Sequence, residues 1–198
     1  MKKELDDLEH IVRFLHEVGS LKNVDRTGWK TVCAPNETVA EHSHRTAVIA
    51  YILAKMANMS LEDENIIIKS ALFHDLHETR ITDLHIIAKK YVKTDQKKCE
   101  DEQICDLPLQ IREDIRKNLQ LPHRLMVYLK DADKLECAFR AKEYLDLGYR
   151  TEEWIENTKS QIKTNEAKKL FETMLKADSA KWIFDIKNKN RTIPHVYP

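Results

Sequence analysis

Apolar residues recur at intervals of three and four along most of the chain, which is the spacing of one face of an α-helix. The first such segment covers about residues 3–18, and its apolar stripe consists of Leu5, Leu8, Ile11, Val12 and Leu15. Gly19 follows it, and glycine commonly ends helices because it adopts left-handed backbone conformations at little cost. The pattern therefore predicts a first helix that ends at Gly19.

Capping residues mark the two helices that follow. Thr38 precedes an apolar run and has Glu41 three residues on, which is the pattern of a capping box. The buried face of this second helix is expected at Val39, Ala47, Ala50, Leu53, Ala54 and Ala57. Ser60 and Asp63 form a related signal and predict a third helix that continues to His74 and beyond.

The second half of the chain predicts further helices. In order, we expect a short helix over 83–91, a polar surface excursion over 93–102, a short helix from Pro108 to near Asn118, a long helix from Pro122 to Leu147, a helix from Thr151, a last helix over 166–187 and an irregular tail over 191–198. Gly148 is expected to end the long helix. Pro108 and Pro122 suit the starts of their helices, because proline fits the first turn of a helix.

Composition supports this helical picture. Only 3 glycines and 5 prolines occur among 198 residues, which favours long helices joined by few loops over a many-stranded sheet. The length suits a single hydrophobic core, and neither a repeat nor a linker is present. We therefore expect one all-α domain over residues 1–198, with C-terminal helices at 151–188.

Charge and cysteine usage limit the possible partners. The 33 basic and 33 acidic residues balance, so the basic excess of a nucleic-acid-binding protein is absent. No apolar run approaches the roughly 18 residues of a membrane span, and the charged N-terminus lacks the apolar core of a signal peptide. The four cysteines show no CxxC spacing. We expect a soluble, cytoplasmic protein with reduced thiols that binds neither nucleic acid nor membrane.

Four residues of metal-ligand type lie far apart in the sequence but in similar surroundings. They are His42, the adjacent pair His74 and Asp75, and Asp133, each within an apolar stretch of helical period. Burying such side chains is costly unless something binds them, and a divalent cation is the simplest partner. The alternative is that each histidine is an ordinary hydrogen-bonded core residue. Periodicity does not decide between Asp131 and Asp133 as the last ligand.

Glu78 lies four residues after His74 and three after Asp75. If the helix continues past His74, then Glu78 lies four residues on and shares its face, with Asp75 about 100° around the helix. One helix could then supply two ligands and hold a carboxylate beside the cation for acid-base chemistry. Mixed imidazole and carboxylate ligands suit Mn, Co, Fe, Zn or Mg without choosing among them.

The order His42, His74-Asp75, Asp133 resembles the HD-domain superfamily of metal-dependent phosphohydrolases, an all-α bundle with its metal site between helices. The flanking segments resemble the 5′-deoxynucleotidase branch, which includes bacterial YfbR-type enzymes and the HD-domain-containing protein 2 group. Those segments are residues 26–29, 37–45, 74–83 and 133–136, and the similarity covers about residues 21–154.

The resemblance implies hydrolysis of deoxyribonucleoside 5′-monophosphates to deoxynucleosides and phosphate. It implies that His42, His74, Asp75 and Asp133 hold the metal, and it selects Asp133 over Asp131. It also implies that Glu78 is the acid-base carboxylate and that Asp83 and Arg26 bind the substrate near its sugar and phosphate. A homodimer is what the family suggests.

Trp29 marks a departure from the bacterial pattern. In the bacterial enzymes a tryptophan directly follows the arginine and crowds the 2′ position of the sugar, whereas here Thr27 and Gly28 separate Arg26 from Trp29. Trp29 either selects deoxynucleotides or packs its loop onto the bundle. Loops of this length, here residues 23–37, are often functional.

Two other functions remain open at this point. One is an HD-type nucleoside triphosphate or alarmone phosphohydrolase, which needs more basic residues than Arg45, Arg80 and Lys134 near the motifs. The other is a non-catalytic, ligand-binding helical bundle, which has no need of an acid-base carboxylate such as Glu78.

Overall fold

The computed structural model describes residues 2–188, and in this range the fold is all-α, as expected. The helices are α1 (Lys2–Gly19), η1 (Ser20–Asn23), α2 (Thr27–Lys30), α3 (Val39–Met56), α4 (Leu61–Phe73), α5 (Glu78–Ile81), η2 (Ala88–Lys90), α6 (Gln96–Ile104), α7 (Leu109–Leu119), α8 (His123–Asp146), α9 (Glu152–Gln161), α10 (Asn165–Lys176) and α11 (Lys181–Asn188). Extended pairing between the described residues is limited to one isolated antiparallel bridge, Asp25 with Thr38.

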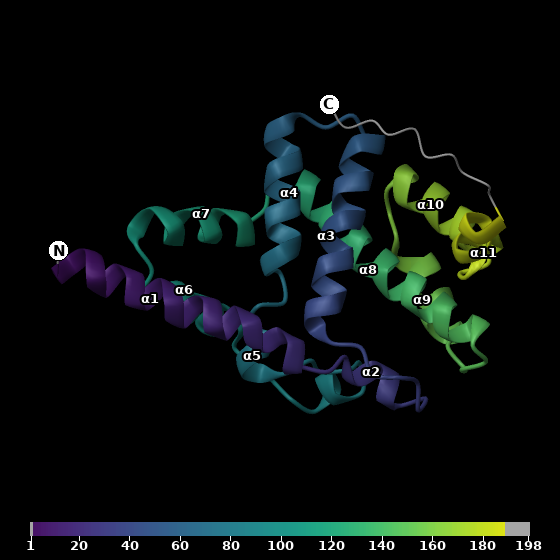
Figure 1. The fold of residues 1–198 in the computed structure, drawn as a ribbon, viewed down its shortest axis with the longest axis horizontal. Coiled ribbons are helices and arrows are strands. Elements are labelled where there is room, and N and C mark those ends of the chain that lie inside the picture. The colour runs from purple at the N-terminus through teal and green to yellow at the C-terminus, as the bar shows by residue number, and fades with distance from the viewer. Residues whose placement is uncertain (1, 189–198) are drawn as a thin grey trace.

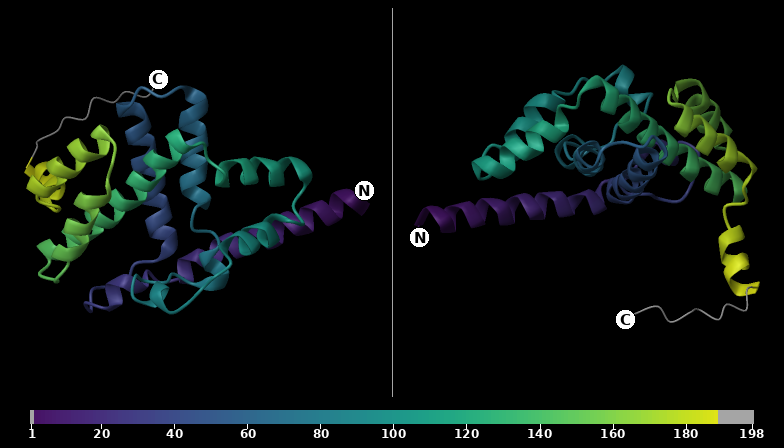
Figure 2. Two further views of the ribbon diagram at one scale, coloured as in Figure 1. Left: turned by 180° about the vertical axis from the view of Figure 1, so that it is seen from behind. Right: turned by 90° about the horizontal axis from the view of Figure 1, so that it is seen from above.

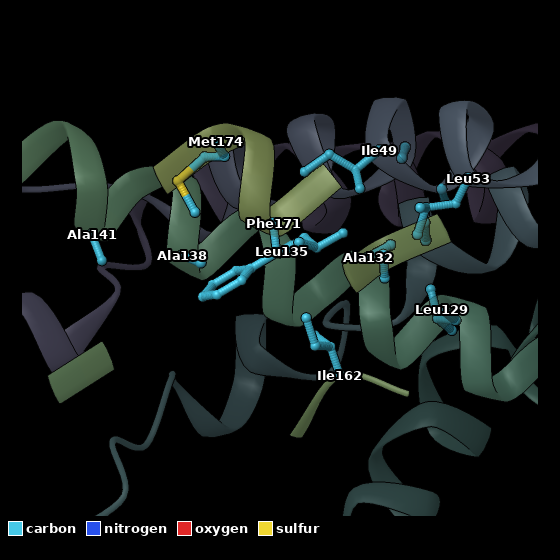
Figure 3. Packing of buried hydrophobic residues seen from close by; sticks show 14 of the residues in the cluster. Ile49, Leu53, Leu129, Ala132, Leu135, Ala138, Ala141, Ile162, Phe171 and Met174 are labelled. Carbon is cyan, nitrogen blue, oxygen red and sulfur yellow. The ribbon is translucent and has the colours of Figure 1, made fainter. Parts of the chain in front are cut away.

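The long helix α8 lies at the centre of the bundle, with α3 and α4 on one side and α9 and α10 on the other (Figure 1). Fully buried alanines at 132, 138 and 141 let neighbouring helices approach α8 closely. Larger side chains fill the space between these alanines, as Figure 3 shows for Ile49, Leu53, Leu129, Leu135, Ile162, Phe171 and Met174. Removing such apolar surface from water stabilises the fold by about 25 cal/mol per Å².

A second, smaller core joins the N-terminal helix to the α6–α7 region. Its buried members are Phe14, Leu21, Val39, Leu76, Ile104, Leu107 and Ile115. Val39 begins α3 three residues before His42, and Leu76 directly follows Asp75 in the turn after α4. The cluster therefore holds the chain in place next to both of these candidate ligands. It therefore links outer helices to the candidate site.

The predicted starts of α3, α4, α7 and α8 are confirmed. Thr38 accepts a hydrogen bond from the Glu41 amide at 3.2 Å, and Glu41 Oε2 accepts one from the Thr38 amide at 2.7 Å. Ser60 caps α4 in the same way through the Asp63 amide. Pro108 and Pro122 immediately precede α7 and α8. Gly148 follows the end of α8 with a φ of +93°, a backbone conformation that residues other than glycine rarely adopt.

Four of the five residues in the apolar stripe of the first helix are exposed instead of buried. Leu5, Leu8, Val12 and Leu15 are 51–60% exposed, and α1 extends away from the bundle (Figure 2). Phe14 and the residues near the C-terminal end of α1 make the contacts with the second core. The helix was correctly predicted, but of its stripe only Ile11 packs against the second core, and the other four side chains are exposed.

The prediction that the third helix continues beyond His74 is wrong, because α4 ends at Phe73. His74 Nδ1 lies 2.8 Å from the Ala71 carbonyl oxygen, an acceptor that the amide of residue 75 would use in a continuing helix. The Leu76 carbonyl receives a hydrogen bond from the Gln103 side chain. The chain forms a tight turn here, and Glu78 begins a separate short helix, α5.

Two other predictions in the second half are wrong, and a third gains a helix. Residues 83–91 contain only the short η2, because the Asp83 carbonyl and carboxylate are both bonded to Thr27. The polar segment 93–102 is mostly exposed, as predicted, and it is also largely helical, with Asp95 capping α6. The helix expected over 166–187 is two helices, since Ala177 is extended. The predicted irregular tail lies outside the described residues.

No described helix combines the length and the apolar character that a bilayer span requires. The cysteines Cys33, Cys99, Cys105 and Cys137 are all free thiols.

Candidate metal centre

Four predicted ligand side chains converge between α3, the turn after α4, and α8. His42 Nε2 lies 3.2 Å from Asp133 Oδ1 and 3.5 Å from Asp75 Oδ2. His74 Nε2 lies 3.1 Å from the same Asp75 oxygen, and the two imidazole rings are 5.4 Å apart. Residues that are up to 91 positions apart in the sequence, from His42 to Asp133, thus form one cluster.

The cluster fits a divalent cation. The Nε2 atoms of His42 and His74 are buried and have no hydrogen-bond partner, although such atoms are rarely left unpaired in folded proteins. The opposite nitrogen of each ring is occupied, at Glu136 for His42 and at the Ala71 carbonyl for His74. Ligand atoms of His42, His74 and Asp75 all lie within 4.8 Å of one another. Imidazole nitrogens and carboxylate oxygens are suitable ligands for Zn, Mn, Fe or Co.

The carboxylates of the cluster are held in their charged form. Burial raises the pKa of Asp75, but the nearby His74, His42 and Arg26 outweigh burial and keep that pKa well below its usual range. Burial likewise raises the pKa of Asp133, but His42, whose Nε2 lies 3.2 Å away, and the nearby His74 outweigh burial and lower that pKa. Ionised carboxylates are the form that coordinates a metal.

Glu78 lies beside the cluster in a different state. Its side chain is 6% exposed, and its Oε2 atom has no hydrogen-bond partner. Burial, followed by the negative charges of Asp75 and Asp83, raises the pKa of Glu78 to about 8. A carboxyl group with such a pKa can hold a proton at neutral pH, which is the property that a general acid requires.

Arg26 connects two acidic residues at the edge of the cluster. Its Nη1 atom lies 3.8 Å from Asp75 Oδ2 and 3.6 Å from Asp83 Oδ1. Asp83 also accepts a hydrogen bond from the Thr27 amide at 2.6 Å, and the Arg26 amide donates to the Glu37 carbonyl at 2.8 Å. The loop before α3 is therefore tied to the segment after α5, so that Arg26 and Asp83 lie side by side.

Trp29 lies in the protein core and not on an open surface. It is 2% exposed, and its indole N–H donates to Glu37 Oε2 at 2.6 Å. Its ring contacts Tyr144 and Trp154, with centroid distances of 5.2 and 5.4 Å. Of the two roles that the sequence left open for Trp29, this geometry favours loop packing.

Replacing Trp29 with phenylalanine should therefore act on stability. The buried Glu37 carboxylate loses its indole donor, which should lower the free energy of unfolding by roughly 1–3 kcal/mol. Urea denaturation measures this change. A shift in the preference between deoxy- and ribonucleotides at unchanged stability would instead assign Trp29 to substrate selection.

Asp131 and Asp133 point to different neighbours. Asp131 is 1% exposed and accepts hydrogen bonds from the Lys163 amide at 3.0 Å and from the Thr164 amide and hydroxyl at 2.7 and 2.6 Å. It therefore caps the start of α10, whereas Asp133 faces His42. This geometry agrees with the choice of Asp133 that the resemblance implied.

An Asp131→Asn variant should be destabilised without losing its metal site. The amide replaces a charged acceptor of three hydrogen bonds, so we expect a decrease of roughly 1.5–3 kcal/mol in the free energy of unfolding. Chemical denaturation and a metal titration of the same sample test both parts. Loss of metal affinity in a folded variant would show that Asp131 contributes to the cation site.

The sequence analysis gave no role to a buried group behind His42. Glu136 is fully buried, and its carboxylate contacts both His42 and Arg45. Glu136 lies three residues after Asp133 on one helix, and Arg45 lies three residues after His42 on another. Residues three apart share a face of a helix, so Glu136 and Arg45 lie on the faces that carry the two ligands. That spacing is a signal from which the group could have been identified.

Known proteins resemble this chain over most of its length. A family model described as HD domain matches residues 18–175. The 5′-deoxynucleotidase HDDC2 of Mus musculus is 31% identical over 147 residues, which cover 69% of this chain and 71% of the relative. The human HDDC2 is 30% identical over 154 residues, covering 71% of each chain.

A solved structure supports the same assignment. The structure of a predicted coding region from Archaeoglobus fulgidus superposes on this one with a TM-score of 0.58, and the two sequences are 33% identical. The match covers 84% of this chain and 94% of the Archaeoglobus chain. The range that the family model matches contains all four clustered residues, His42, His74, Asp75 and Asp133. By sequence and by fold, the chain belongs to the HD domain family.

Proposed function

We propose that this protein is a divalent-metal-dependent 5′-deoxynucleotidase, which hydrolyses deoxyribonucleoside 5′-monophosphates to deoxynucleosides and phosphate. The observation that carries the proposal is the pair of buried, unpartnered Nε2 atoms of His42 and His74, which face Asp75 and Asp133. Relatives named 5′-deoxynucleotidase, about 30% identical to this chain, support the choice of substrate.

The four ligands would be His42, His74, Asp75 and Asp133. When bound there, a divalent cation supplies Lewis-acid polarisation of a phosphate oxygen and lowers the pKa of water. The ligand set leaves Mn, Co, Fe, Zn and Mg as candidates. Imidazole and carboxylate together suit the first four well, and Mg prefers oxygen ligands.

Glu78 and Arg26 would act directly on the substrate. Glu78, with its pKa raised to about 8, holds a proton that it can donate to the 5′ oxygen as a water oxygen bonds to phosphorus and the bond from phosphorus to the 5′ oxygen breaks. Arg26 presents a planar guanidinium, which can donate two hydrogen bonds to the oxygens of a phosphate. Both side chains lie beside Asp75, so phosphate bound at the cluster lies within their reach.

Asp83 would bind the sugar. Its Oδ1 atom faces Arg26 at 3.6 Å, while its other oxygen is held by Thr27. A fixed carboxylate next to the phosphate-binding arginine is suited to accept a hydrogen bond from a deoxyribose hydroxyl. Since Trp29 is buried, we propose that any preference for deoxynucleotides arises from this Arg26–Asp83 region.

Phosphate release from a matched panel of substrates tests the function. We expect orthophosphate from deoxynucleoside monophosphates, less from ribonucleoside monophosphates, and a strict requirement for one of the five divalent ions. Release of pyrophosphate or triphosphate from larger substrates would instead indicate a triphosphate or alarmone phosphohydrolase. Absence of both metal binding and phosphate release would indicate a non-catalytic bundle.

We also propose a homodimer in the cytoplasm. The apolar stripe of α1, at Leu5, Leu8, Val12 and Leu15, is more than half exposed and could be covered by a second copy. Four free thiols are consistent with a reducing compartment. Light scattering coupled to size-exclusion chromatography measures the assembly, and a monomeric mass at micromolar concentration would contradict the dimer.

A further inference from the structure

We propose that Glu136 is a positioning residue that orients His42 toward the metal and thereby sets the affinity of the site for the cation. Glu136 Oε2 lies 2.5 Å from His42 Nδ1, the ring nitrogen opposite the one that faces Asp75 and Asp133. With Nδ1 carrying the hydrogen, Nε2 keeps its lone pair for a ligand bond. The inference rests on the metal site of the proposed function.

The two oxygens of Glu136 have different partners, which fixes the plane of the carboxylate. While Oε2 contacts His42, Oε1 accepts a hydrogen bond from Arg45 Nε at 2.9 Å, and Arg45 Nη2 lies 2.8 Å from the same oxygen. Two nitrogens of one guanidinium thus contact a single carboxylate oxygen, and such charge-assisted contacts are stronger than neutral ones. Rotation of Glu136 away from His42 would break both contacts with Arg45.

Arg45 is itself held from its other side. Its Nη1 atom donates to Glu143, which lies on α8 seven residues after Glu136. Arg45 follows His42 on α3, so the arginine and the histidine move with the same helix. The chain of contacts from Glu143 through Arg45 and Glu136 therefore fixes α3 to α8 at the level of His42.

Burial makes the arrangement sensitive to small changes. Neither His42 nor Glu136 is exposed, so water cannot replace a lost contact. An unpaired buried carboxylate is costly, and Glu136 avoids that cost only through His42 and Arg45. The other imidazole ligand, His74, is oriented by a backbone carbonyl instead, which no side-chain substitution removes. Of the two groups that orient the imidazole ligands, Glu136 is therefore the one that a side-chain substitution can remove.

Metal titration of the metal-free protein provides the test. In a Glu136→Gln variant, the amide keeps the size of the side chain but loses its charge, and its NH₂ group can face His42 Nδ1. Removing such outer contacts typically costs 10–100-fold in metal affinity, and we expect this increase in the Kd for Mn²⁺ or Zn²⁺. Saturating metal should restore most of the phosphate release that the variant loses at limiting metal.

A matched control separates positioning from stability. Glu64 is also a buried, ion-paired glutamate, bonded to Lys55 at 2.7 Å, but it contacts none of the ligands. Glu64→Gln should reduce Tm and leave the metal Kd unchanged. Glu136→Asp serves as a second variant, since its shorter carboxylate keeps the charge but cannot maintain both contacts. The visible spectrum of bound Co²⁺ should change in both Glu136 variants and not in Glu64→Gln.

Three outcomes are distinguishable. Weaker metal binding and an altered Co²⁺ spectrum in the two Glu136 variants support the proposal. Wild-type metal affinity in these variants, with a reduced Tm, overturns it and makes Glu136 a structural ion pair. If the wild-type protein binds no divalent ion and releases no phosphate, the proposed function itself fails, and the positioning role fails with it.

Discussion

Replacing Glu78 with glutamine is expected to lower kcat for phosphate release by roughly 10²–10⁴-fold, the usual contribution of an acid-base group. Glutamine has nearly the same size but cannot exchange a proton, so the substitution removes chemistry and little volume. The raised pKa of Glu78, caused by burial and by Asp75 and Asp83, would make its carboxyl group a proton donor near neutral pH. Steady-state kinetics at saturating metal measure the change.

Metal content distinguishes this loss from damage to the site. We expect Glu78→Gln to bind the cation as the wild type does, because the four proposed ligands are unchanged. Glu100→Gln is a suitable control, since Glu100 lies on α6 and its nearest ionic neighbour is His77, at 3.7 Å, a residue without a proposed role. That control should retain nearly full kcat. Near wild-type turnover in Glu78→Gln would remove Glu78 from the mechanism.

The sequence was sufficient for features with local causes. The start of α3 depends on a reciprocal contact between Thr38 and Glu41, which are only three residues apart. Pro108 and Pro122 precede α7 and α8 for the equally local reason that proline lacks an amide hydrogen. Such signals involve no distant partner, so they can be interpreted without knowledge of the fold.

Predictions were wrong where distant residues determine the local structure. The end of α4 at Phe73 depends partly on Gln103, which donates to the Leu76 carbonyl from another helix. Asp83 forms no helix with the residues after it because Thr27, 56 positions earlier, binds its carboxylate. Helical periodicity records none of these contacts, because it describes only one segment at a time.

The choice between Asp131 and Asp133 shows the same limit within the candidate site. Helix α8 is buried against α3 and α4 on one side and α9 and α10 on the other, so it has no continuous polar face. Asp131 faces the start of α10, and Asp133 faces His42. Periodicity alone could not separate them, whereas the family pattern could.

Replacing Asp133 with asparagine is expected to lower kcat/KM by roughly 10³-fold or more at a fixed metal concentration. Metal ions typically supply several kcal/mol of charge stabilisation to phosphoryl transfer, and each 1.36 kcal/mol corresponds to a tenfold change in rate. The substituted amide would be a neutral ligand in place of a charged one, beside a His42 nitrogen that Asp133 contacts at 3.2 Å. Phosphate release over a range of metal concentrations measures the loss and shows whether excess metal restores activity.

Thermal unfolding provides an independent measurement of the same site. A cation at 100 times its Kd should stabilise the wild-type protein by about 2.7 kcal/mol, because it binds the folded state. In Asp133→Asn, the same metal concentration should give a much smaller increase in Tm, since the Kd is higher. Asp131→Asn, on the same helix, should show the opposite pattern, with a lower Tm without metal and a full response to it. Equal metal responses in Asp133→Asn and the wild type would remove Asp133 from the ligand set and return the choice of the fourth ligand to experiment.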